Sequence, residues 1–91
     1  MKNISFQEAE RLLTGRLMGI YGIGQGRKAA GVLLPAIFRD FRKVLKDHEG
    51  EETSETYKSE DRKAEIILTG IRLAGKSSLT RIVFNGLEIE I

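Results

Sequence analysis

The sequence contains no cysteine and no tryptophan, and it has only one proline and one histidine. Without cysteine there is no disulfide framework, no thiol nucleophile and no thiolate-bound zinc. The absence of cysteine also suits a cytoplasmic protein. No stretch approaches the roughly 18 uncharged apolar residues of a membrane-spanning helix, and the first residues lack the apolar run of a signal peptide. We therefore expect a cytoplasmic protein without a membrane segment.

Clusters of catalytic residues are missing as well. His48 is the only histidine, and at the expected end of a helix it complements the helix dipole. Neither Glu8 and Glu10 nor Glu51 and Glu52 are spaced as a catalytic pair beside an apolar pocket. The residues therefore indicate no catalytic centre, no metal site and no cofactor, and we expect a protein that binds rather than an enzyme.

The composition fits one small domain over residues 1–91. Apolar residues make up 41% of the chain and charged residues 31%, which is ordinary for a globular protein. A domain of this length buries roughly 60% of its unfolded surface, so a deep, enclosed site is not expected. Association of two copies would bury more surface, so a homodimer is an alternative to a monomer.

The net charge of +2 hides an asymmetry between the two halves of the chain. Residues 1–48 hold nine Lys/Arg against four Asp/Glu, a formal charge of +5. Residues 49–91 hold six against nine, a formal charge of −3. A basic half suggests a surface that faces a polyanion.

The basic half is predicted to be helical. Ser5 and Glu8 form a capping box, so a first helix should begin at Phe6. Three glycines within residues 22–26 should end it. A second helix is expected from near Arg27, clearest over residues 36–48, as one helix bent at its proline and ended by Gly50.

The acidic half is predicted to begin with a linker and to end in a sheet. Residues 47–61 carry seven acids and one lysine, which is typical of a solvated, mobile segment. Strands are expected over residues 63–73 and 79–91, the second folded back at Asn85-Gly86 because this dipeptide favours a type I′ hairpin turn. That register pairs Phe84 with Leu87, Ile82 with Ile89, Thr80 with Ile91 and Arg81 with Glu90. The predicted fold is α+β: two N-terminal helices packed on a three-stranded antiparallel meander over residues 62–91.

Residues 17–34 resemble the helix-hairpin-helix motif of DNA-binding proteins. Leu17, Ile20, Gly22, Ile23 and Gly24 match its pattern, whereas Lys28 stands where the family has a small side chain. The resemblance implies that free amides of the hairpin contact backbone phosphate without reading sequence. Free amides at a helix N-terminus attract anions in any family. The residues proposed here for phosphate contact are Gly24, Gly26, Arg27 and Lys28.

Residues 70–77 are similar to the phosphate-binding loop of P-loop NTPases, with the pattern G-x-x-x-x-G-K-S. The resemblance implies that Gly75, Lys76 and Ser77 hold phosphate and magnesium. Only fourteen residues follow Ser77, whereas that family needs further strands and a second acidic residue. An ordinary turn between two strands explains the same residues, and we favour the turn.

A third pattern is a basic stripe on the second helix. Arg39, Arg42, Lys43 and Lys46 recur at helical spacing, which suits contacts to phosphates or to an acidic protein surface. Asp40 and Asp47 dilute the stripe. The leading hypothesis is a nucleic-acid-binding module. The alternatives are a regulatory adaptor that binds a protein, and ATP or GTP binding at residues 70–77.

Overall fold

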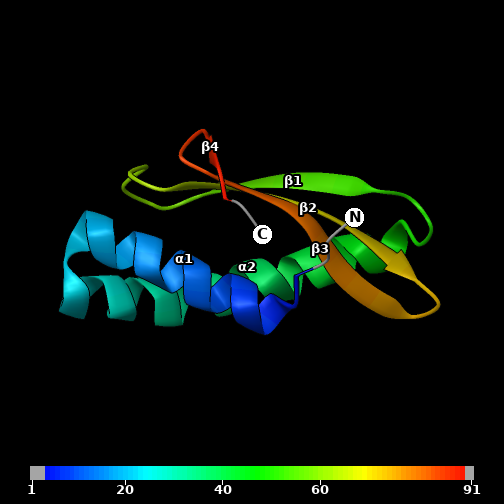
Figure 1. Cartoon of the computed structure of the whole chain (residues 1–91), viewed down its shortest axis with the longest axis horizontal. Coiled ribbons are helices and arrows are strands. Elements are labelled where there is room, and N and C mark those ends of the chain that lie inside the picture. Colours follow the sequence, from blue (N-terminus) through cyan, green and yellow to red (C-terminus); the bar gives the residue numbers. More distant parts are fainter. Residues whose placement is uncertain (1–3, 90–91) are drawn as a thin grey trace.

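The computed structural model describes residues 4–89, which form two helices and a four-stranded antiparallel sheet (Figure 1). Both helices pack on one face of the sheet, whose strands lie in the order β1-β2-β3-β4. The predicted α+β class is confirmed, but the sheet has one strand more than expected. The elements are α1 (Phe6–Tyr21), α2 (Ile23–Asp47), β1 (Thr53–Lys58), β2 (Glu65–Leu73), β3 (Lys76–Phe84) and β4 (Leu87–Glu88).

Helix α1 begins where the capping residues place it. The Ser5 hydroxyl accepts a hydrogen bond from the Glu8 amide at 3.1 Å, which satisfies one of the free N–H groups of the first turn. Apolar residues at helical spacing then face the sheet and are buried. These residues are Phe6, Ala9, Leu13 and Leu17.

The connection between the helices is one residue long, so the predicted five-residue break is wrong. Gly22 alone reverses the chain, with φ 89° and ψ 164°. Helix α2 therefore begins at Ile23 rather than near Arg27, and Gly24 and Gly26 lie inside it. A Cβ on Gly26 would lie 2.3 Å from the Met18 Cα. Gly26 is thus a packing residue, needed because the two helix backbones touch.

Helix α2 continues through Pro35 to Asp47, which confirms a single second helix. Pro35 has no N–H group, so it gives no hydrogen bond to the carbonyl of Gly31, one turn earlier. Both residues are exposed, where water can satisfy that carbonyl. The helix ends in a turn at residues 48–50, where Gly50 has φ 87°.

The acidic segment is a strand and not a mobile linker. Strand β1 pairs with β2 along its whole length, from Thr53 opposite Gly70 to Lys58 opposite Glu65. Its residues alternate between half-buried and exposed, the pattern of an edge strand with one face on the core. Tyr57 packs against the core on that inner face. Only one of the seven acids, Glu55, lies in β1, at a half-buried position, and the other six lie outside the strand, so they do not prevent pairing.

Two tight turns build the rest of the sheet. Ala74 and Gly75, with φ 53° and 78°, join β2 to β3. Asn85 and Gly86, with φ 50° and 81°, join β3 to β4, and the two positive φ values confirm the predicted type I′ turn. The Asn85 side chain also accepts from the Glu65 amide at 2.7 Å, which ties this turn to β2.

The predicted register of the last hairpin is confirmed in the described residues. Phe84 pairs with Leu87, and the Ile89 amide donates to the Ile82 carbonyl at 2.9 Å. The predicted pairs Thr80 with Ile91 and Arg81 with Glu90 involve residues outside the described range. Arg81 Nε lies 3.2 Å from the Glu88 carboxylate.

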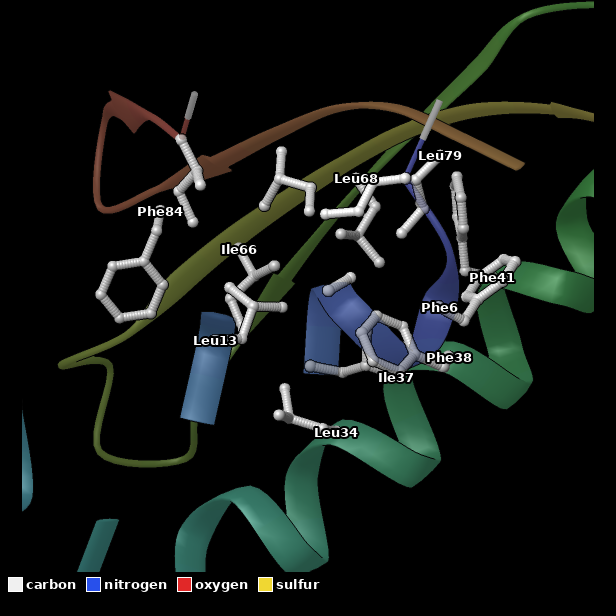
Figure 2. Packing of buried hydrophobic residues seen from close by; sticks show 14 of the residues in the cluster. Phe6, Leu13, Leu34, Ile37, Phe38, Phe41, Ile66, Leu68, Leu79 and Phe84 are labelled. Atoms are coloured by element: carbon white, nitrogen blue, oxygen red, sulfur yellow. The ribbon is translucent and has the colours of Figure 1, made fainter. Parts of the chain in front are cut away.

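The core lies between the helix pair and the inner face of the sheet (Figure 2). Phe41 is fully buried. Its ring lies against Gly70 of β2, where an added Cβ would be 3.1 Å from the ring. Ile4 closes one side of the core by pairing with Leu79 of β3. The Ile4 amide donates a hydrogen bond to the Leu79 carbonyl at 3.1 Å. Within residues 4–89, neither helix has an apolar stretch long enough to cross a bilayer.

Candidate functional site

A basic groove of about 540 Å³ lies in the corner between the first turn of α1, the second half of α2 and the end of β2. The apolar floor comes from Phe6, Pro35 and Phe38. The predicted basic stripe of α2 forms one wall of the groove, and Arg72 of β2 adds a fifth base. We call this the basic groove; its charged residues are Glu10, Arg39, Arg42, Lys43, Lys46 and Arg72.

The charge balance of the basic groove is strongly positive. Five bases line it against one acid, Glu10. Among residues 4–89, none of these five bases lies within 4.0 Å of a carboxylate. Cations that are close together and lack carboxylate partners attract an anion, because the anion relieves their mutual repulsion. The predicted residues Arg39, Arg42, Lys43 and Lys46 are therefore brought to one site.

Arg42 is held in a defined position by aromatic packing. Its guanidinium carbon lies 4.3 Å from the centre of the Phe6 ring, and this cation–π contact contributes about 0.5–1 kcal/mol at an exposed site. Phe6 is itself fixed by an edge-on contact with Phe38, with ring centres 5.6 Å apart and planes at 79°. The guanidinium is thus preorganised, and within residues 4–89 it has no carboxylate partner.

Asp40, which was expected to dilute the basic stripe, is directed away from it. The Tyr57 hydroxyl of β1 donates a hydrogen bond to Asp40 Oδ2 at 2.7 Å. Neither Asp40 nor any residue of β1 lines the basic groove. Asp40 is therefore engaged by β1, and the only acid that lines the groove among residues 4–89 is Glu10.

The Tyr57–Asp40 bond predicts a dependence of stability on alkaline pH. Burial and the neighbouring carboxylate of Asp40 raise the pKa of Tyr57 above its usual 10.0. This stabilisation is complete below the unfolded pKa and is lost as pH rises toward the folded one. We expect the unfolding free energy of Tyr57→Phe, measured in urea, to fall less than that of wild type between about pH 9 and 12. Parallel curves for the two proteins would contradict the bond.

The residues predicted around the helix connection do not form one site. Arg27 lines a second depression of about 470 Å³ with Arg11, Thr14 and Met18 of α1. Lys28 lines a different one, beside Asp61 and Glu60, whose carboxylates do not favour an anion. The Gly26 amide donates to the Gly22 carbonyl at 2.7 Å, so it is not free as the helix-hairpin-helix resemblance implied. Gly24, in the first turn of α2, is exposed.

The segment that is similar to a phosphate-binding loop forms a β-hairpin. Residues 70–73 belong to β2, Ala74 and Gly75 form the turn, and β3 starts at Lys76. A nucleotide loop needs a helix after its lysine, whose N-terminal amides surround the phosphate. Here the Gly75 amide donates to the Glu49 carboxylate at 3.2 Å, and Ser77 accepts from Arg72 at 3.4 Å. The favoured interpretation as a turn is confirmed.

One base of the basic groove, Arg72, and the hydrogen-bond partner of Asp40, Tyr57, were missed from the sequence. Arg72 was noticed only as part of the glycine-lysine string, and its approach to α2 depends on how β2 curves over the helix. Tyr57 was assigned to a linker, although Thr53, Thr56 and Tyr57 are residue types that favour strands. Among residues 4–89 there is no group of three or more His, Asp or Glu side chains that could hold a metal ion.

Comparisons of the chain with protein-family models, with curated proteins and with solved structures found no match. The basic groove is therefore interpreted from its own residues.

Proposed function

We propose that this protein is a non-enzymatic binding module that holds the phosphate backbone of a nucleic acid in the basic groove. The observation that carries the proposal is the set of five bases around one groove, none paired with a carboxylate within residues 4–89. Each phosphate that binds there releases condensed counterions from the nucleic acid, which is the main source of affinity in contacts that do not read sequence.

The types of base suit phosphate. Arg39, Arg42 and Arg72 each offer a planar fork of N–H donors that can hold two phosphate oxygens at once. Lys43 and Lys46 add point charges on flexible stems. Along α2 the stripe from Arg39 to Lys46 is about 10 Å long, at 1.5 Å per residue. Contacts of this kind position a nucleic acid without selecting bases, so we expect weak sequence preference.

The proposal is tested by measuring oligonucleotide binding at low salt to a variant that lacks two bases of the groove. Arg39→Ala combined with Lys43→Ala is expected to weaken binding of a fluorescent oligonucleotide by about tenfold and to reduce the salt slope by about 1 to 2. Both positions are exposed, so folding should be unaffected. Fluorescence anisotropy over a series of salt concentrations measures both quantities.

The matched control removes one lysine and one arginine from the opposite side of the molecule. Lys58 and Arg81 lie on the outer face of the sheet, where they pair with Glu65 and Glu88. Lys58→Ala with Arg81→Ala changes the net charge equally and should leave binding near wild type. Equal losses in the two double variants would mean attraction to the whole molecule and no defined groove. Absence of binding at low salt, with an acidic protein bound instead, would replace the proposal by a protein adaptor.

A further inference from the structure

The basic groove continues along the seam between α1 and α2. The depression that contains Arg27 and Arg11 shares two lining residues, Gln7 and Glu10, with the basic groove. The two hollows are therefore neighbours on the same side of the helix pair. Together they form a track with seven bases and one acid. We call it the seam; its bases are Arg11, Arg27, Arg39, Arg42, Lys43, Lys46 and Arg72.

Gly31 of α2 lies between the residues of the two hollows. Gly31 lies four residues after Arg27 and four before Pro35, and residues at this spacing share one face of a helix. No atom lies within 4 Å of a Cβ built on Gly31. Between its two ends, Arg27 and Lys46, α2 rises by about 28 Å at 1.5 Å per residue.

From these observations we propose that the ligand of the seam is a single-stranded nucleic acid, laid lengthwise between the two helices. This inference rests on the proposed function. In an extended strand, phosphates are spaced at roughly twice the 3.4 Å rise of a stacked strand in a duplex. A length of about 28 Å therefore holds about four or five phosphates.

The packing of the helices disfavours a duplex. Gly26 brings the backbones of α1 and α2 into contact, so the pair is about 20 Å wide at 10–12 Å per helix. The major groove of B-DNA is about 12 Å wide and admits one helix. A duplex could thus touch only the rims of the seam, whereas one strand can lie within it.

Arg42 provides a second argument for an unpaired strand. One face of its guanidinium lies on the Phe6 ring, and the residue is exposed. The opposite face is a flat cation on which a nucleic-acid base can stack. Only a base that is free of a duplex can present its face in this way.

The experiment measures binding of fluorescent oligo-dT of 2 to 12 nucleotides and of a 12-base-pair duplex, by anisotropy in one buffer. We expect affinity to rise up to about five nucleotides and then to level off, with a salt slope near −3, which is about 0.7 per phosphate. The duplex should bind about tenfold more weakly. A duplex that binds as tightly as the strand would overturn this inference and leave the proposed function standing. If neither binds, the proposed function itself fails.

The path along the seam is tested by two matched glycine variants. Gly31→Glu places a negative charge in the middle of the seam, and it should lower oligo-dT affinity by about tenfold. Gly19→Glu makes the same change at an exposed, uncrowded position of α1 beside the β3–β4 turn, and it should bind as wild type does. Glutamate is a better helix former than glycine, so both should raise Tm by a few degrees. Unchanged binding in Gly31→Glu would contradict the path.

Discussion

Replacing Gly26 by alanine is expected to destabilise the fold by about 3 kcal/mol. The new methyl carbon would lie 2.3 Å from the Cα and 2.5 Å from the backbone nitrogen of Met18. Backbone atoms of a helix cannot rotate aside as a long side chain can, so α1 and α2 would have to separate near their connection. Urea unfolding followed by circular dichroism measures the loss.

Gly31→Ala is the control for this variant. It makes the same chemical change in the same helix, five residues later, where no atom lies within 4 Å of the added carbon. Because alanine is the better helix former, this protein should be about 1 kcal/mol more stable than wild type. Two alanine variants that shift stability in opposite directions would establish the close contact of the helices. Equal stability of Gly26→Ala and wild type would show that the contact is absent.

Phe41→Ala is expected to cost about 4 kcal/mol and to lower Tm by roughly 20 °C, at 4–8 °C per kcal/mol for a domain of this size. Phe41 is fully buried, and its ring occupies the space that Gly70 leaves by having no side chain. Truncation would leave a cavity between α2 and β2 that neighbouring residues cannot fill without moving the helix against the sheet. Thermal unfolding by circular dichroism or calorimetry measures the change.

Two further substitutions calibrate that result. Phe41→Leu keeps most of the apolar volume and should cost less than half as much. Val32→Ala removes apolar atoms from the same helix at a position that is 80% exposed, and it should be nearly neutral. A loss below about 1 kcal/mol for Phe41→Ala would mean that the ring is not a central core element.

Local sequence signals predicted the start of α1 and the last hairpin because their causes are local. Ser5 and Glu8 lie within one helical turn, and the Asn85-Gly86 turn depends only on the φ values of its two residues. The boundary of α2 could not be predicted in the same way. Gly26 reads as a helix breaker in sequence, and its actual role depends on Met18 of the other helix.

Strand β1 was missed because the acidic composition was given more weight than the strand-favouring residues Thr53, Thr56 and Tyr57. Seven acids in residues 47–61 suggest a solvated segment, yet six of them lie outside β1, and Tyr57 within that strand reaches the core. Four bases of the basic groove followed from their spacing on one helix. The approach of Arg72 and the contact of Asp40 with Tyr57 could not be foreseen, because each depends on how a strand lies against α2.

The pairing of Ile4 with Leu79 has a consequence for how the chain folds. Within residues 4–89, the two helices are consecutive in sequence, and each strand of the sheet pairs with the next. Such contacts between near neighbours close quickly, and proteins rich in them have low contact order and short folding times. The Ile4–Leu79 bridge joins residues 75 positions apart, so its loop is among the slowest to close. Removing the first residues should therefore speed unfolding while hardly affecting the rate of folding.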